Sequence, residues 1–217
     1  MRFSAPPHRD KEWAMAELYL LTPPRIDAGF VKTFETTLRA GAVSAVQIRL
    51  KGHGLEETLQ LAPPLIAAAR RAGATVIMND DPHLAAKLGC DGVHIGQEDG
   101  SLADARAAMG KDALVGVTCH DSRHLAMVAG ERGADYVAFG AVYSSATKTP
   151  KTSAPLELFT WWRELFELPS VAIGGITVDN AGPVIAAGAD YLAVCGGIWS
   201  HEQGPEHACE AFSSLLG

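Results

Sequence analysis

Short segments of successive apolar residues recur along the chain, and most follow a glycine that ends an alanine- and leucine-rich stretch. Glycine suits the end of a helix because it adopts positive φ without a Cβ clash. Strands that are apolar at every position are typical of parallel sheets, which are buried on both faces. The pattern predicts eight strands: Leu18–Leu21, Ala45–Arg49, Val76–Met78, Gly92–Ile95, Leu114–Thr118, Tyr136–Gly140, Ser170–Ile173 and Tyr191–Val194.

Each predicted strand is followed by a segment with helical spacing of apolar residues, such as "LADARAAMG" at 102–110. Eight strand–helix units in a chain of this length predict an α/β fold, a single (β/α)8 TIM barrel. A doubly wound open sheet is the alternative, but the terminal unit closes the count at eight. Pro63-Pro64 leaves the second helix open, since the helix could begin there or be kinked there.

The domain organisation follows from the same pattern. Residues 1–16 lack the apolar core of a signal peptide and form a predicted N-terminal tail, and residues 17–217 form one barrel domain. No apolar run is long enough to span a bilayer.

Composition and charge narrow the choice of partner. Hydrophobic residues make up 47% of the 217 residues and charged residues 20%, as in ordinary globular domains. The formal charge of −7 argues against a nucleic-acid-binding surface. The four cysteines are dispersed without a CxxC pair, which indicates reduced thiols in a cytoplasmic protein rather than a disulfide framework.

Polar side chains stand where the predicted strands end, and in a (β/α)8 barrel these ends form the active face. Gln47, Arg49 and Lys51 alternate onto one side by the strand period of two. A guanidinium fork and an ammonium suit phosphate oxygens. Two carboxylates, Asp80 and Asp99, follow the third and fourth strands. Acids beside cations fit Mg²⁺ shared with substrate phosphates, although each acid alone would more readily be a helix cap.

Glycines follow the last two strands, as Gly174-Gly175 and Gly196-Gly197. This fold commonly binds phosphate there through exposed backbone N–H groups. The local cations Arg49, Lys51 and Lys148 therefore indicate an anionic ligand in an otherwise acidic protein.

Several motifs, taken in order, closely resemble those of the thiamine-phosphate synthase family. They are "QIRLK", "NDD", "GVHIGQED", "GVTCH", "GADYVAFGAVYSSATK" and "VAIGGIT", and together they cover nearly the whole chain after the first dozen residues. The resemblance implies an alkyl transferase that uses Mg²⁺. It would join 4-amino-2-methyl-5-(diphosphooxymethyl)pyrimidine to 4-methyl-5-(2-phosphooxyethyl)thiazole, giving thiamine phosphate and diphosphate. A homodimer is left open.

The resemblance also implies roles for individual residues, carried over motif by motif. The metal would be held by Asp80 and Asp99, and the leaving diphosphate would be stabilised by Arg49, Lys51 and Lys148. The implied substrate-binding residues are Gln47, Arg49, Lys51, Asn79, Thr118 (where the family commonly has Ser), Ser145, Ala146, Thr147, Lys148, Gly175, Cys195 and Gly196.

Other polar residues near the strand ends have simpler interpretations. Asp81 and Glu98 are expected to cap helices or support the ligands, and His94 to be a satisfied interior histidine. His120 stays open, because related thiazole tautomerases use a histidine near this position. Trp161-Trp162 is expected to pack in the core or at an oligomer contact.

Cys119 and Cys195 are not expected to act as nucleophiles, because neither has a clear partner base. The long loop 141–155, rich in Ser, Thr and Pro, is expected to close over the substrates.

The two rival functions are a thiazole tautomerase and a non-catalytic phosphate-binding barrel, and the complete Arg/Lys/Asp/Asp set favours the synthase over both.

Overall fold

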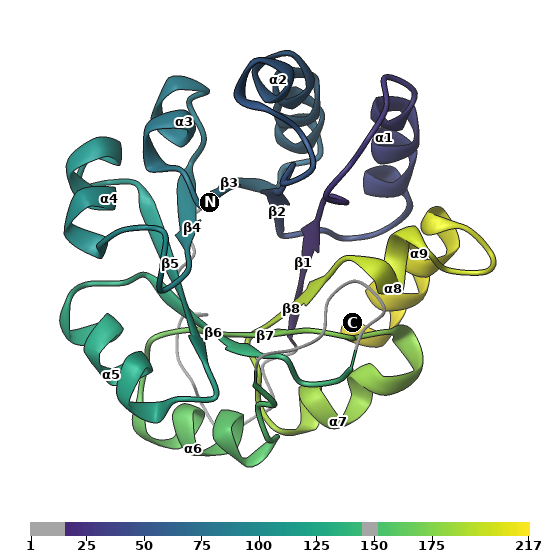
Figure 1. Cartoon of the computed structure of the whole chain (residues 1–217). Coiled ribbons are helices and arrows are strands. Elements are labelled where there is room, and N and C mark those ends of the chain that lie inside the picture. Colours follow the sequence, from purple (N-terminus) through teal and green to yellow (C-terminus); the bar gives the residue numbers. More distant parts are fainter. Residues whose placement is uncertain (1–15, 145–151) are drawn as a thin grey trace.

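The computed structural model describes residues 16–144 and 152–217, and within them eight parallel strands close into a barrel (Figure 1). Each strand pairs with the next one along the chain, and the last pairs with the first. The strands are β1 (Glu17–Leu21), β2 (Ala45–Ile48), β3 (Thr75–Asn79), β4 (Gly92–Ile95), β5 (Leu114–His120), β6 (Tyr136–Gly140), β7 (Ser170–Ile173) and β8 (Tyr191–Val194). The predicted fold class is confirmed, and the strand ends differ from prediction by at most two residues.

Helices surround the ring of strands (Figure 1). They are α1 (Phe30–Ala40), α2 (Leu55–Arg71), α3 (Pro82–Lys87), α4 (Leu102–Met109), α5 (Arg123–Glu131), α6 (Glu157–Leu165), α7 (Ala181–Ala186), α8 (Gly196–Trp199) and α9 (Pro205–Leu216), with a 3₁₀ turn η1 (Val178–Asn180) before α7. In the described part of the chain, none of these helices has the length and apolarity needed to cross a membrane.

Helix α2 runs without a break through Pro63 and Pro64, so it does not begin at the prolines. Both prolines are exposed, whereas Ala62, Leu65 and Ile66 are buried against the barrel. A proline inside a helix removes a backbone hydrogen bond and costs about 3 kcal/mol. Burial of the opposite face of this seventeen-residue helix offsets that cost. The two prolines alone do not reveal this burial, so the sequence left the start of the helix open.

Strand residues alternate between two cores. The interior of the barrel is filled by Tyr19, Leu21, Ala45, Ile77, Tyr136, Ala138, Val171, Tyr191 and Ala193. The alternate strand positions, such as Val46 and Phe139, face the surrounding helices. Successive side chains of a strand point alternately into the barrel and toward the helices. Because the strands are parallel, their carboxyl ends lie at one edge of the barrel, and the polar residues that follow the strands meet there.

The paired tryptophans of α6 belong to the outer core. Trp162 is 1% exposed, donates its Nε1–H to the carbonyl of Leu168 at 2.7 Å and stacks on Phe166. Trp161 is half-buried, and the guanidinium of Arg123 lies 4.4 Å from the centre of its ring. The packing interpretation is therefore confirmed for Trp162, and the pair supplies no argument for an oligomer contact.

Candidate active site

The cluster at the carboxyl ends of β2, β3 and β4 contains one cation and two acids. Lys51 Nζ lies 2.8 Å from Asp80 Oδ2. Burial raises the pKa of Asp80, the Lys51 ammonium lowers it, and the nearby Asp99 carboxylate raises it again, with a net rise. Asp80 and Asp99 therefore lie close enough to repel each other, as the sequence pattern predicted from two aligned strand ends.

Local backbone geometry aims both acids at the mouth of the barrel. Asp80 has φ of 68° and donates its N–H to the carbonyl of His94 at 2.8 Å, so it turns out of β3 while remaining tied to β4. Asp99 Oδ2 accepts the N–H of Gly96 at 2.8 Å, which curls the loop after β4 around the carboxylate. Asp81 instead caps α3 by accepting the N–H groups of His83 and Leu84, as expected.

Arg49 stands at the mouth between the ends of neighbouring strands. Its backbone N–H donates to Thr22 Oγ1 at 2.8 Å, which ties the end of β2 to the end of β1. Burial raises the pKa of Cys195, and the Arg49 guanidinium opposes that rise. Strand β1 lies between β2, which carries Arg49, and β8, which ends before Cys195. The charge of Arg49 therefore reaches across the end of β1 to the end of β8.

A chain of hydrogen bonds crosses the barrel interior below the acids. Gln47 Nε2 donates to the hydroxyl of Tyr19 at 3.1 Å, and that hydroxyl lies 3.0 Å from the hydroxyl of Tyr136. The Tyr136 hydroxyl lies 3.0 Å from His94 Nδ1, and His94 Nε2 lies 2.7 Å from Thr118 Oγ1. Five strands are thus joined through side chains, and the chain ends on the threonine predicted to contact diphosphate.

Burial lowers the pKa of His94 to about 4, so the ring is neutral at physiological pH. The predicted interior histidine is confirmed. The two tyrosines of this chain are residues that sequence reasoning missed, although the strand period places both on interior positions. Gly116 on β5 makes room for one of them, because a Cβ there would lie 1.9 Å from Cζ of Tyr136.

Bare backbone occupies the ends of β7 and β8. Gly175 has φ of 65°, and a Cβ there would lie 2.5 Å from the carbonyl oxygen of Ser144. The Gly175 carbonyl accepts from Asn180 Nδ2 at 2.9 Å, which fixes the turn. Helix α8 begins at Gly196, directly after Cys195, so its first N–H groups have no partner within the helix. Both strand ends therefore offer the backbone geometry that suits a phosphate.

The remaining predicted residues fall into two groups. Asn79 ends β3 and is half-buried, and His120 ends β5 with φ of 55°. The predicted thiazole- and diphosphate-contacting residues of the loop after β6, Ser145, Ala146, Thr147 and Lys148, lie outside the described residues, as does the middle of the expected lid.

The cysteines at the mouth are poor nucleophiles. Burial raises the pKa of Cys119 to about 12, and its Sγ lies 3.5 Å from the carbonyl of Val117. The pKa of Cys195 is also raised. A thiolate is the reactive form of cysteine, so the expectation that neither acts as a nucleophile is supported.

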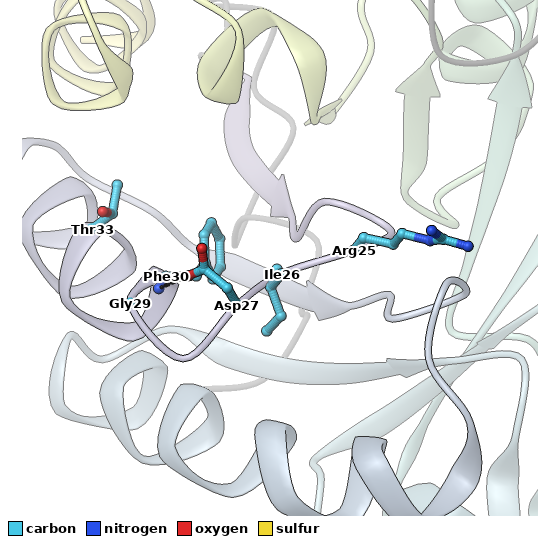
Figure 2. Close-up of a pocket in the computed structure, with 6 residues that line it drawn as sticks. All are labelled: Arg25, Ile26, Asp27, Gly29, Phe30 and Thr33. Carbon is cyan, nitrogen blue, oxygen red and sulfur yellow. Dashed lines mark hydrogen bonds between the residues drawn. The ribbon is translucent and has the colours of Figure 1, made fainter.

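Two surface hollows of about 610 Å³ lie near the strand ends, and neither is lined by Lys51, Asp80 or Asp99. One of them lies beside the loop between β1 and α1 (Figure 2). Across the described residues, no group of three or more His, Cys, Asp or Glu side chains could hold a metal by itself. The candidate site is therefore the open rim at the strand ends, where Lys51, Asp80 and Asp99 lie together.

The closed parallel barrel and its charged rim define a (β/α)8 enzyme that acts on an anionic, phosphate-bearing ligand. Residues 18–198 match the family model described as thiamine monophosphate synthase. The chain is 54% identical to the thiamine-phosphate synthase of Rhodospirillum centenum, over 92% of this chain and 97% of that protein. It is 48% identical to the thiamine-phosphate synthase of Hyphomonas neptunium, over 92% and 93%.

A solved structure agrees with these sequence relatives. The thiamine phosphate pyrophosphorylase of Pyrococcus furiosus is 28% identical and superposes with a TM-score of 0.81, over 92% of this chain and 95% of that one. The chain belongs to the thiamine-phosphate synthase family, whose members are transferases. The resemblance read from its motifs is confirmed.

Proposed function

We propose that this enzyme joins a pyrimidine diphosphate to a thiazole phosphate at the barrel mouth, releasing diphosphate and forming thiamine phosphate. The observation that carries the proposal is the cluster of Lys51, Asp80 and Asp99. A barrel that only bound phosphate would gain nothing from two adjacent acids, since they repel an anion. Family membership adds the reaction class.

Asp80 and Asp99 are the residues that would hold Mg²⁺. Their fit is supported by electrostatics, because burial and the like charge of Asp99 both disfavour the Asp80 carboxylate, and a divalent cation would offset both. Mg²⁺ commonly takes one or two protein carboxylates and completes its shell with water and substrate phosphate oxygens. When bound, the ion would neutralise negative charge on the diphosphate.

Arg49 and Lys51 would bind the diphosphate and stabilise it as it leaves. The C–O bond to the pyrimidine methylene breaks with its electron pair on oxygen, so these cations stabilise the transition state more than the ground state. The thiazole nitrogen then forms the new C–N bond with its own lone pair. No general base is required, which agrees with the raised pKa values of Cys119 and Cys195.

Thr118, Gln47 and Asn79 would position the pyrimidine diphosphate from the floor of the mouth. The Thr118 hydroxyl is held by His94 at 2.7 Å, so its orientation is set before the substrate binds. Gln47 is 3% exposed and gives one amide hydrogen to Tyr19. Its amide has a second hydrogen and a carbonyl oxygen with which to contact the pyrimidine.

The thiazole phosphate would lie against the backbone at Gly175 and at Cys195-Gly196. This placement is supported by the positive φ of Gly175 and by the start of α8 at Gly196. The proposal retains Ser145, Ala146 and Thr147 as thiazole contacts and Lys148 as a diphosphate contact, on the strength of the sequence motif alone.

A diphosphate-release assay with both substrates tests the function. We expect stoichiometric diphosphate and thiamine phosphate only when both substrates and Mg²⁺ are present. A thiazole tautomerase would release no diphosphate, and a non-catalytic barrel would bind a substrate without turnover. Either of these results would overturn the proposal.

Two further parts of the proposal concern the surroundings of the enzyme. We place it in the cytoplasm because all four cysteines are free thiols. The homodimer remains a prediction, which light scattering on the purified protein tests. A single species with the mass of one chain would contradict it.

A further inference from the structure

Arg25 lies in the loop between β1 and α1, a segment to which the proposed function gives no role. It lines a hollow together with Ile26, Asp27, Gly29, Phe30 and Thr33. Figure 2 shows Asp27, Phe30 and Thr33 beside the start of α1, whereas Arg25 extends in the opposite direction, away from α1. Its side chain passes the end of β2 and lies over the turn that leads to α2.

This loop is fixed to the loop that carries Lys51. The N–H of Gly52 donates to the carbonyl of Pro24 at 2.7 Å, and the N–H of Ile26 donates to His53 Nε2 at 3.0 Å. The other ring nitrogen of His53, Nδ1, lies 2.8 Å from Glu57 Oε1. The position of Arg25 is therefore set relative to Lys51 by contacts on both sides of it.

The side chain of Arg25 crosses directly over Gly52. A Cβ at Gly52 would lie 2.1 Å from Cγ and 2.7 Å from Nε of Arg25. Gly52 is not among the residues with positive φ, so an alanine would meet no backbone strain there. The glycine is needed for the space that the arginine occupies.

The crossing places Nε of Arg25 over the residue that directly follows Lys51, and Lys51 Nζ pairs with Asp80. Within residues 16–144 and 152–217, no carboxylate forms an ion pair with Arg25, whereas Arg39 pairs with Glu35 and Arg106 with Asp135. The Arg25 side chain is exposed, and the planar fork of an unpaired guanidinium matches the oxygens of a phosphate.

We propose that Arg25 binds the diphosphate group of the pyrimidine substrate, beside the loop that carries Lys51. The inference rests on the proposed function for the identity of the substrate. The contact itself can be tested without that substrate, because inorganic diphosphate with Mg²⁺ should also bind to this rim through Arg25. An arginine that only covers the β2–α2 turn with its apolar stem is the competing explanation.

Binding of inorganic diphosphate in the presence of Mg²⁺, measured by calorimetry, tests the contact without requiring turnover. We expect Arg25→Ala to weaken binding about tenfold, the loss typical of one charge-assisted hydrogen-bonding group. Arg25→Lys keeps the charge without the fork and should weaken binding less. Arg39→Ala removes the same charge from a side chain that is 71% exposed, and should leave binding unchanged.

Gly52→Ala gives a second, independent arm. It should displace Arg25 and weaken diphosphate binding in the wild-type background, but add almost nothing in the Arg25→Ala background, because the clash is then absent. Equal effects of Gly52→Ala in both backgrounds, or unchanged binding in Arg25→Ala, would overturn the inference.

Steady-state kinetics separates this inference from the proposed function. Arg25→Ala should raise the KM for the pyrimidine diphosphate about tenfold and leave the KM for the thiazole phosphate unchanged. A rise confined to the thiazole KM would count against Arg25 as a diphosphate ligand. A wild-type enzyme that binds diphosphate but makes no thiamine phosphate would refute the function and leave the Arg25 contact standing.

Discussion

At the scale of single residues, Asp80 combines a strained backbone with a destabilised charge. Its φ of 68° lies in the left-handed region, which Asn and Asp tolerate better than other residues with a Cβ. Its pKa is raised, chiefly by burial. The folded state therefore favours the neutral form, so the carboxylate reduces stability at neutral pH and this effect fades as pH falls through the raised pKa. Such local costs are typical of functional positions.

Asp80→Asn should therefore lower turnover severely while raising stability. We expect turnover to fall by a factor on the order of a hundred or more, by analogy with other electrostatic catalytic groups. The midpoint of urea unfolding should rise above that of the wild type, because a neutral amide replaces a disfavoured charge. Asp80→Ala should be less stable than Asp80→Asn by about 1 kcal/mol, since alanine does not tolerate this φ.

Asp99→Asn is the matched variant for the second acid, because the amide oxygen can still accept the N–H of Gly96. It should lose activity to a similar extent. Near-normal turnover in either asparagine variant would refute the assignment of the acids to the metal.

At the scale of elements, the strands are joined through the barrel interior as well as through their backbones. Tyr19 and Tyr136 are 117 positions apart in the sequence, and their hydroxyls meet at 3.0 Å. The ring of His94 stacks on that of Tyr136 with centroids 5.5 Å apart, and both ring nitrogens have partners. A buried network in which every side chain has a hydrogen-bonding partner holds one arrangement of the strands and keeps Thr118 oriented.

The low pKa of His94 predicts a pH dependence of stability. The pKa is about 4 in the folded protein and about 6.5 in an unfolded chain, so the unfolded state binds more protons between these values. The contribution of the neutral His94 ring to the free energy of unfolding is fully present above pH 6.5. It declines as pH falls toward 4, by up to about 1.4 kcal/mol for each pH unit.

Urea unfolding from pH 7 to pH 4 measures this decline in the wild type and in His94→Gln. Protonation of Asp80 acts in the opposite direction in both proteins, so the difference between the two profiles isolates the histidine. Parallel profiles would show that His94 does not carry the effect.

At the scale of the whole molecule, the charged rim draws on strands from separate parts of the chain. Lys51, Asp80 and Asp99 follow β2, β3 and β4, and Cys195 follows β8. A ligand that bridges these ends binds the closed barrel but not the unfolded chain, so its binding free energy adds to the stability of the whole domain.

Diphosphate with Mg²⁺ should therefore raise the melting temperature. At a ligand concentration 100 times its dissociation constant, the stabilisation is about 2.7 kcal/mol. Differential scanning fluorimetry with both components, with each alone, and with a chelator measures it. Asp80→Asn should lose the Mg²⁺-dependent part of the shift, and an unchanged shift in that variant would contradict the metal assignment.

The sequence by itself determined the barrel and the composition of its rim. Eight continuously apolar segments, separated by helical segments that end in glycine, predicted a closed parallel barrel, which the structure confirms. Parallel strands place all their carboxyl ends at one edge. Residues that directly follow the strands, such as Asp80 and Asp99, were therefore predicted to meet without knowledge of the tertiary structure.

Only the tertiary structure decided which side chains pair across that edge. The contact of Tyr19 with Tyr136 and the crossing of Arg25 over Gly52 depend on how the strands close and on where two loops approach each other. Helix α2 likewise passes through its two prolines because its other face is buried. Such pairings depend on distances between residues far apart in the chain, and local periodicity carries no information about those distances.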